Sequence, residues 1–187
     1  MPKVISGLLK GRNIKGFDIE GTRPTMDRVK ESIFAIIQNN ISNSIVLDLF
    51  AGSGNLGIEA ISNGAKLVYF NDKNKKCLNV IKDNLSNFNV LDKGILTNMD
   101  YHDALNYYSN KNIKFDLVFL DPPYKDKIIN DILEIMITKK LLKDNSLIIC
   151  ELNNNDIFIN DKLLLFKERQ YGDKKVLIYK YYENNVK

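Results

Sequence analysis

The stretch Ile45-Val-Leu-Asp-Leu-Phe-Ala-Gly-Ser-Gly-Asn-Leu-Gly57 decides the fold of this chain. It opens with apolar residues that are typical of a short buried strand, and the acidic residue Asp48 lies within that run. Gly52, Gly54 and Gly57 follow, together with apolar residues at helical spacing. Glycines let the backbone turn tightly and pass close to a ligand, because they carry no Cβ. The stretch therefore predicts a strand, a ligand-binding turn and a helix.

Strand and helix patterns alternate along the chain beyond this stretch. Further strands are expected at residues 66–70, 95–99, 115–120 and 146–152, and the helices between them at residues 75–85, 103–108 and 128–137. Such alternation implies right-handed crossovers and a parallel sheet with helices on both faces. Residues 163–169 and 176–182 are two more strand patterns with no helix between them, so they predict an antiparallel hairpin. A mostly parallel, seven-stranded α/β sheet that ends in such a hairpin is the layout of the class I, Rossmann-like methyltransferase fold.

Length and composition indicate one globular domain. The chain has 187 residues, of which 44% are hydrophobic and 27% charged, so it can bury a single sizeable core. It contains no apolar run of the roughly 20 residues that a membrane helix needs, and no secretory signal is evident. Cys77 and Cys150 lie far apart with no Cys-X2-Cys spacing, which predicts buried thiols and no metal site. We expect a cytoplasmic protein with no membrane association.

The positive charge is concentrated at the N-terminus. The net charge is +4, and residues 1–30 hold seven basic and three acidic side chains, so the remaining residues balance at zero. We expect residues 1–24 to form a basic arm or hairpin, and residues 25–187 to form a single domain whose first helix is capped by Thr25. On charge alone, the basic segment is either a solvated tail or an arm that contacts phosphates.

Acidic residues are expected at the C-terminal ends of three consecutive strands, where open α/β sheets bind ligands. They are Asp48, Asp72 and Asp100. Asp72 lies 20 residues after Gly52, as in dinucleotide-binding domains, but Asp48 would repel a pyrophosphate in the turn. The cationic amino and sulfonium groups of S-adenosylmethionine suit this acid better. Asp72 can then accept the ribose hydroxyls and Asp100 the adenine amine.

The sequence therefore predicts a site for S-adenosylmethionine, with S-adenosylhomocysteine as its product form and with no metal. Met99 would pack on the adenine ring. The predicted cofactor contacts are Asp48, Phe50, Gly52, Gly54, Asp72, Met99 and Asp100.

The second motif is Asp121-Pro122-Pro123-Tyr124, directly after the expected strand at residues 115–120. An exocyclic base amine is a poor nucleophile, because its lone pair is delocalised into the ring. The Asp121 carboxylate and the Pro122 carbonyl can each accept one N–H, which frees that lone pair for attack on a methyl group. The two prolines stiffen the loop, and Tyr124 offers a stacking face for an unstacked base. These four residues are the predicted catalytic group.

The two motifs together resemble those of amino-methyltransferases that act on bases. Over nearly its whole length, the chain more closely resembles the bacterial small-subunit ribosomal RNA guanine-N2 methyltransferases. The segments that carry this resemblance are Ile5-Ser-Gly7, Lys10-Gly-Arg12, Thr22-Arg-Pro-Thr-Met-Asp-Arg-Val-Lys-Glu31, Asp48-Leu-Phe-Ala-Gly-Ser-Gly54 and Asp121-Pro-Pro-Tyr124.

The resemblance implies a single-domain enzyme that methylates one guanine of 16S ribosomal RNA. It also implies that Lys10, Arg12, Arg23 and Arg28 face the cofactor mouth or the RNA. The expected partner is 16S rRNA, either naked or within a small-subunit assembly particle, and the expected state is a monomer.

Three other functions fit the sequence less well. A DNA adenine-N6 or cytosine-N4 methyltransferase uses the same Asp-Pro-Pro-Tyr chemistry, but such enzymes usually add a region that reads the bases. A non-catalytic RNA-binding module would not need all four aspartates. An NAD oxidoreductase would need an acid or base for hydride transfer, and His102 has no sequence neighbour that suggests one.

Overall fold

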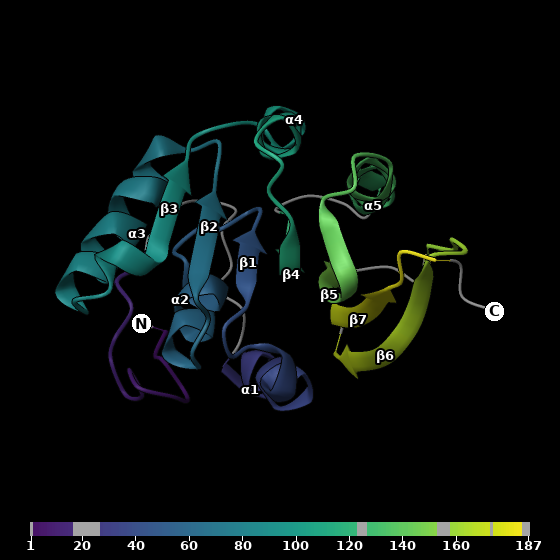
Figure 1. The fold of residues 1–187 in the computed structure, drawn as a ribbon. Coiled ribbons are helices and arrows are strands. Elements are labelled where there is room, and N and C mark those ends of the chain that lie inside the picture. Colours follow the sequence, from purple (N-terminus) through teal and green to yellow (C-terminus); the bar gives the residue numbers. More distant parts are fainter. Residues whose placement is uncertain (1, 17–26, 123–126, 153–157, 173, 185–187) are drawn as a thin grey trace.

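The computed structural model describes residues 2–16, 27–122, 127–152, 158–172 and 174–184 (Figure 1). One sheet contains the strands β1 (Ile45–Asp48), β2 (Leu67–Asn71), β3 (Gly94–Thr97), β4 (Phe115–Leu120), β5 (Leu142–Leu152), β6 (Leu163–Tyr171) and β7 (Lys174–Tyr181). The α-helices of the described residues are α1 (Asp27–Ile37), α2 (Asn55–Ser62), α3 (Lys75–Asn87), α4 (Tyr101–Asn110) and α5 (Lys127–Thr138). Two short 3-10 helices are η1 (Gln38–Asn40) and η2 (Leu91–Lys93).

The strand order is β3-β2-β1-β4-β5-β7-β6. Neighbouring strands from β3 to β5 are parallel, whereas β7 is antiparallel to both β5 and β6. The predicted mostly parallel sheet with an antiparallel hairpin at its end is therefore confirmed. Because β7 is antiparallel to both of its neighbours, β6 runs in the same direction as β5. The strands β1 to β6 all end at the same edge of the sheet, which we call the carboxyl edge. The opposite edge, at which β7 ends, is the amino edge.

Several boundaries differ from the expectation, and two of these differences have a clear physical cause. β3 ends at Thr97, before Met99, because Asp100 serves as the N-cap of α4 and its Oδ1 accepts a hydrogen bond from the His102 N–H at 3.0 Å. β5 begins at Leu142, earlier than expected, because Leu142 already pairs with Phe115 of β4. The predicted cap Thr25 lies outside the described residues.

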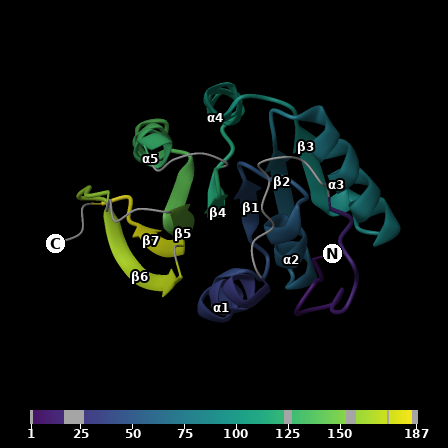
Figure 2. The same ribbon diagram turned by 180° about the vertical axis from the view of Figure 1, so that it is seen from behind.

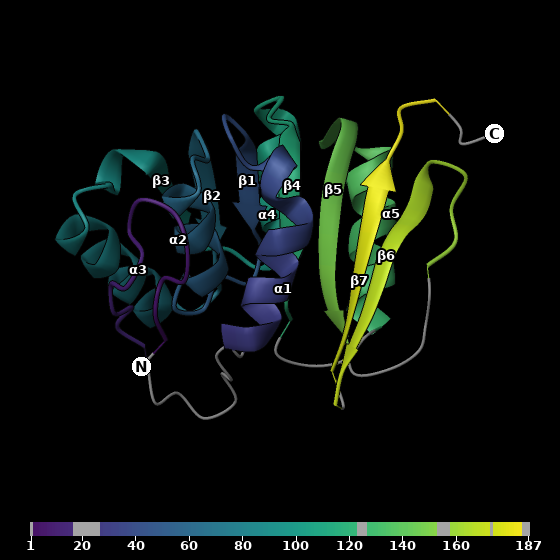
Figure 3. The same ribbon diagram turned by 90° about the horizontal axis from the view of Figure 1, so that it is seen from below.

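Helices cover both faces of the sheet (Figures 1 and 2). On one face, which we call the α1 face, α1, α2 and α3 share an apolar core that includes Ile33, Ile58 and Ile81. On the other, the α4 face, α4 and α5 share a second core that includes Leu105 and Ile132. Figure 3 shows β7 and β6 beside α1 at the end of the sheet, and Val176 and Ile178 of β7 are buried in the core that α1 shares.

The described part of the N-terminal segment packs against the α1 face. Val4, Leu9 and Ile14 are buried in the same core as α1, α2 and α3. Lys30 of α1 is fully buried, and its Nζ lies 3.0 Å from Glu59 Oε2 of α2. Glu59 also accepts hydrogen bonds from the backbone N–H groups of Ile5 and Ser6. Lys30, which contributes to the basic charge of residues 1–30, is therefore an internal residue.

No helix of the described residues is long and apolar enough to span a membrane.

Candidate active site at the carboxyl edge

The chain order reverses at β1. In the sheet, β2 and β3 lie on one side of β1, and β4 and β5 lie on the other. Open α/β sheets bind ligands in the crevice outside the carboxyl ends of the strands at such a reversal. The glycine turn follows β1 and Asp121 directly follows β4, so both predicted motifs flank this point.

The glycine turn leaves open space beside its backbone. Gly52 and Gly54 have φ values of +53° and +79°, which L side chains rarely adopt. Apart from its chain neighbours, no atom lies within 4 Å of the position of a Cβ on Gly52. A Cβ on Gly57 would instead lie 2.2 Å from the ring of Phe70. Gly52 therefore leaves room for a ligand, and Gly57 permits the close packing of α2 on β2.

Asp48, at the end of β1, is 3% exposed. Its Oδ2 accepts a hydrogen bond from the Gly57 N–H of α2 at 3.0 Å. Burial raises the pKa of its carboxyl to about 7; the Gly57 N–H opposes this rise and the nearby Asp72 adds to it. A bound cation would stabilise the ionised carboxylate and lower the pKa again. The geometry suits the predicted ammonium contact, which stays a prediction.

Asp72 connects the end of β2 to the glycine turn. Its Oδ2 accepts a hydrogen bond from the Gly52 N–H at 2.9 Å, and its Oδ1 accepts one from the Asn74 N–H at 2.8 Å. These two amides fix the orientation of the carboxylate beside the open space at Gly52. The carboxylate suits the hydroxyls of a ribose, because it can accept two further hydrogen bonds.

Asn71, which the sequence analysis did not single out, connects three loops at the carboxyl edge. Its buried Nδ2 donates to the backbone oxygens of Leu49 and Met99, at 3.2 and 3.1 Å. Its Oδ1 accepts a hydrogen bond from Thr97 Oγ1 at 3.1 Å. Asn71 therefore holds the residues after β1 and β3 in place around β2. The sequence signal that could have indicated Asn71 is its position: it is a side-chain amide next to Asp72, at the end of an apolar strand.

Met99 and Asp100 lie at the same edge, after β3. Met99 packs on the α4-face core, as does Phe50 of the glycine turn. Phe50 also contacts Tyr101, with 6.1 Å between ring centroids. Phe50, Met99 and Tyr101 thus form an apolar group beside Asp100, the residue that was predicted to bind the adenine amine.

His102 has a partner that the sequence analysis missed. Its Nε2 lies 3.4 Å from Asp131 Oδ2 of α5, and the Tyr101 hydroxyl donates to the same oxygen at 3.1 Å. Both side chains of the His102–Asp131 pair are about half exposed, at 52% and 48%. The pair joins α4 to α5 beside the carboxyl edge. No sequence signal could have found it, because 29 residues separate the two positions.

The catalytic motif is described only in part. Asp121 and Pro122 are partly buried directly after β4, whereas Pro123 and Tyr124 lie outside the described residues. Leu120, the last residue of β4, pairs with Cys150 of β5. Asp121 therefore lies at the carboxyl edge between the ends of β1 and β5, in the sheet position next to the glycine turn.

The predicted RNA-contacting residues do not all share this edge. Leu9 donates to Ser62, the last residue of α2, and the Arg12 guanidinium lies 5.7 Å from the ring centroid of Phe88, which follows α3. Because α2 and α3 begin at the carboxyl edge, their ends, and with them Lys10 and Arg12, lie towards the amino edge. Arg28 is exposed on the first turn of α1, and Arg23 lies outside the described residues.

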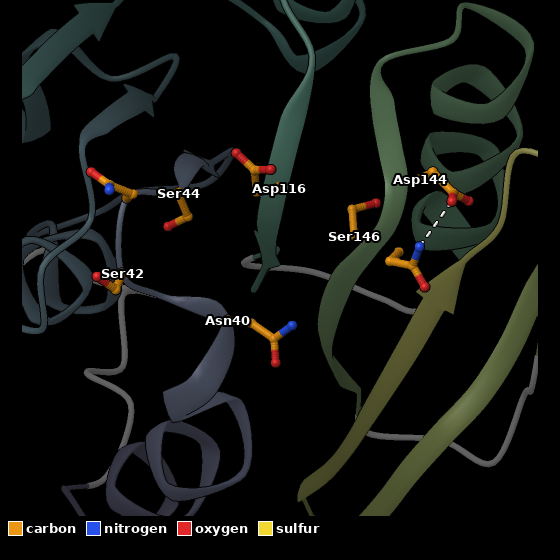
Figure 4. Close-up of a pocket in the computed structure, with 8 residues that line it drawn as sticks. Asn40, Ser42, Ser44, Asp116, Asp144 and Ser146 are labelled. Carbon is orange, nitrogen blue, oxygen red and sulfur yellow. Dashed lines mark hydrogen bonds between the residues drawn. The ribbon is translucent and has the colours of Figure 1, made fainter.

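A polar pocket lies at the amino edge, away from both motifs (Figure 4). Asp116 on its wall accepts hydrogen bonds from the Ile45 N–H and from Lys143 Nζ, both at 2.7 Å. Asn145 donates to Asp144 at 2.8 Å. Both acidic groups of this pocket therefore already have partners, and those of Asp116 connect β4 to β1 and β5. Within the described residues, no three His, Cys, Asp or Glu side chains form a group that could hold a metal ion.

Comparisons with known proteins identify the family and the fold of the chain. The family model described as "Conserved hypothetical protein 95" matches residues 2–180. Ribosomal RNA small subunit methyltransferase D of Haemophilus influenzae is 35% identical over 184 residues, which are 97% of this chain and 93% of that protein.

Solved structures confirm the predicted class I methyltransferase fold. The crystal structure of HI0767 from Haemophilus influenzae has a TM-score of 0.79 at 32% identity and covers 97% of this chain and 98% of that one. An RNA methyltransferase from Salinibacter ruber in complex with S-adenosyl-L-homocysteine has a TM-score of 0.66 at 14% identity and covers 88% of this chain and 97% of that one. At that identity, the second likeness concerns the fold alone.

Proposed function

The chain belongs to the family described as "Conserved hypothetical protein 95", and on that premise we propose that it methylates the N2 amine of a guanine in 16S ribosomal RNA. The methyl donor is S-adenosylmethionine. The observation that carries the proposal is the meeting of two motifs: the glycine turn after β1 and Asp121-Pro122 after β4 follow neighbouring strands at the same carboxyl edge of the sheet. The relative from Haemophilus influenzae, named for small-subunit ribosomal RNA, supports the choice of substrate.

The residues of the carboxyl edge fit the proposed cofactor. Asp48 offers a buried carboxyl to an ammonium group, and Gly52 leaves open space beside its backbone. Two backbone amides orient the Asp72 carboxylate towards hydroxyl donors. Phe50 and Met99 provide an apolar wall next to Asp100. When bound, S-adenosylmethionine supplies an electrophilic methyl group on its sulfonium.

Asp121 and Pro122 act on the amine of the target base. The Asp121 carboxylate and the Pro122 carbonyl each accept one N–H of that amine, which localises the nitrogen lone pair for in-line attack. The carboxylate interacts more strongly as positive charge develops on the nitrogen, so it stabilises the transition state more than the ground state. Pro122 restricts the backbone and so fixes the direction of its carbonyl. The amine can release its proton to solvent after attack, so His102 is not needed as a base.

Methylation of defined substrates tests this proposal. The protein is incubated with S-adenosylmethionine carrying a labelled methyl group and with protein-free 16S rRNA, assembled small subunits or duplex DNA. Nucleoside mass spectrometry then identifies the product, and we expect N2-methylguanosine in rRNA. Labelled adenine or cytosine in DNA would overturn the proposal in favour of a DNA methyltransferase. RNA binding without any methylation would indicate a non-catalytic RNA-binding module.

A further inference from the structure

The β6–β7 hairpin carries most of the uncompensated positive charge outside the N-terminus. Residues 163–181 hold five basic and two acidic side chains, a net charge of +3. Because residues 31–187 balance at zero, the rest of that range has a net charge of −3. The hairpin is therefore a local basic region that the overall balance conceals.

Ion pairs neutralise only part of this charge. Lys174 pairs with Glu151 at 2.9 Å, and Lys175 pairs with Glu168 at 2.6 Å. Lys167 and Arg169 form no ion pair within the described residues, and both are exposed. Arg169 donates one hydrogen bond to the Glu168 carbonyl at 3.0 Å, and Lys167 Nζ lies 6.0 Å from the ring centroid of Phe166. Two cations are thus exposed on an ordered strand without a carboxylate to neutralise them.

The strand register puts both cations on the α1 face. Lys167 and Arg169 pair with Ile178 and Val176, whose side chains belong to the α1-face core. Glu168 pairs with Leu177 of the α4-face core. Since side chains alternate between the two faces of a strand, the carboxylate lies on the opposite face, where Lys175 pairs with it. The α1 face of β6 therefore presents cations without the neighbouring anion.

The same register aligns this face with the catalytic motif. Leu120, Cys150, Leu177 and Glu168 lie in one row across β4, β5, β7 and β6. Asp121 follows Leu120, and Arg169 follows Glu168 in the next row. Because adjacent strands are about 4.8 Å apart, the backbones at Asp121 and Arg169 are roughly 14 Å apart. Figure 3 shows the hairpin extending past the neighbouring strands at this edge.

A contact with α1 holds the hairpin in this position. The Tyr171 hydroxyl at the end of β6 donates to Ser32 Oγ of α1. Arg28 lies four residues before Ser32, hence on the same side of that helix, and is exposed. Arg28, Arg169 and Lys167, which are exposed on the α1 side from the carboxyl edge along β6, are called the basic strip.

We propose that this basic strip binds the phosphate backbone of the RNA that flanks the target guanine. The inference rests on the proposed function, because that function brings RNA to Asp121. Phosphates are the group that exposed, unpaired lysine and arginine side chains recognise without reading sequence. The exposed ring of Phe166, at 43%, adds a face on which a base or sugar can pack.

The salt dependence of RNA binding tests the strip. The Lys167→Gln/Arg169→Gln variant is compared with the wild type and with Lys111→Gln/Lys139→Gln, which removes the same charge from exposed positions at the ends of α4 and α5. Affinity for protein-free 16S rRNA is measured across a potassium chloride series. Each lost phosphate contact lowers the slope of log K against log salt by about 0.7–0.9. We expect the hairpin variant to lose about 1.4–1.8 from this slope and the control to lose little.

Two further measurements separate the strip from the proposed function. Both variants should keep the wild-type melting temperature and the wild-type affinity for S-adenosylmethionine. A hairpin variant with the wild-type slope, in a preparation whose wild type binds and methylates rRNA, overturns the strip and leaves the function intact. An equal loss in the control variant also overturns it. The hairpin variant could also keep the wild-type slope on protein-free RNA and yet bind assembled particles more weakly than the wild type does. That result would overturn RNA binding by the strip and assign the strip to a protein partner. A wild type that neither binds nor methylates rRNA overturns both proposals.

Discussion

Asp48 at the end of β1 and Glu59 on α2 are both buried acidic residues, but their partners differ. Glu59 meets the Lys30 ammonium, the backbone N–H groups of Ile5 and Ser6, and the Ser6 hydroxyl. Among the described residues Asp48 accepts one hydrogen bond, from the Gly57 N–H, and burial raises its pKa to about 7. A fully satisfied buried charge holds elements together, whereas a buried acid with few partners can still respond to a ligand. The difference teaches that burial alone does not separate a structural charge from a functional one.

The largest effect should come from breaking the satisfied pair. Glu59→Gln leaves the Lys30 ammonium buried without a charged partner and weakens the anchor of residues 5 and 6. Removing one member of a buried pair typically costs about 3–5 kcal/mol of unfolding free energy. Urea denaturation measures this loss, and Glu134→Gln on the exposed side of α5 is the control. A loss below about 1 kcal/mol, which is usual for surface pairs, would show that the two buried acids are not as different as their contacts indicate.

Asp121 should show the opposite behaviour, with a large effect on rate and little on stability. Asp121→Ala removes a carboxylate that matters most while charge develops on the amine. Loss of one such contact costs on the order of 10²–10³ in rate. Single-turnover methylation of rRNA measures the rate, calorimetry checks that cofactor affinity is retained, and Asp116→Ala at the amino edge is the comparison. Full activity of Asp121→Ala would exclude the proposed mechanism.

The raised pKa of Asp48 makes a pH-dependent prediction. Between the ordinary value of 3.8 and the native value of about 7, the unfolded chain loses this proton first, so the native state loses stability as pH rises through that window. Asp48→Asn removes this dependence. Relative to the wild type, the variant should gain on the order of 1–3 kcal/mol of unfolding free energy between pH 4.5 and pH 8.

Cofactor binding should depend on pH in the reverse sense. A cation binds better to the ionised carboxylate, so wild-type affinity for S-adenosylmethionine should rise from pH 6 to pH 8, and Asp48→Asn should bind weakly at both. The exposed Asp92→Asn is the control for both experiments. Parallel stability curves for wild type and Asp48→Asn would mean that Asp48 is ionised in the native protein, which would place it in the same class as Glu59.

The smallest effect is expected at His102. Its pair with Asp131 is half exposed, and such pairs contribute about 1 kcal/mol or less to stability. His102→Ala should therefore shift the melting temperature slightly and leave single-turnover methylation nearly unchanged. Asp131→Asn removes the charge of the partner and also weakens the Tyr101 contact, but it keeps the His102 ring. Comparing the two variants therefore separates the effect of the ion pair from the effect of the imidazole ring. An inactive His102→Ala would mean that the reaction needs a base and that the amine cannot simply release its proton.

Much of the site could be predicted because its signals are local. The glycine turn, the acids at the ends of β1 and β2, and the Asp121-Pro122 loop each lie within a few residues of a recognisable strand. Asn71 and Asp131 could not be predicted in the same way, because they act on residues 22 to 30 positions away along the chain. Lys30 is an intermediate case. It lies three and four residues before Ile33 and Phe34, on the apolar side of α1, which was a signal that it is buried.

The N-terminal segment and the hairpin show why charge counts needed the structure. The count for residues 1–30 includes Lys30, whose charge Glu59 neutralises inside the protein. Truncation of residues 2–16 would also remove Val4, Leu9 and Ile14 from the core, so substitutions of Lys10 and Arg12 are the better test of RNA contact. In the hairpin, a count of residues 163–181 reveals the basic character but not which cations are free of ion pairs.

The sequence by itself determined the order of strands and helices, the ligand-binding turn and the residues of the methylation motif, because periodicity, glycines and prolines act over a few residues. Only the tertiary structure decided which charged side chains form ion pairs within the protein and which face solvent. Pairs such as Lys30–Glu59 and Lys175–Glu168 depend on the register of strands and the packing of helices. These are set by the burial of apolar surface across the whole chain, and no local pattern encodes them.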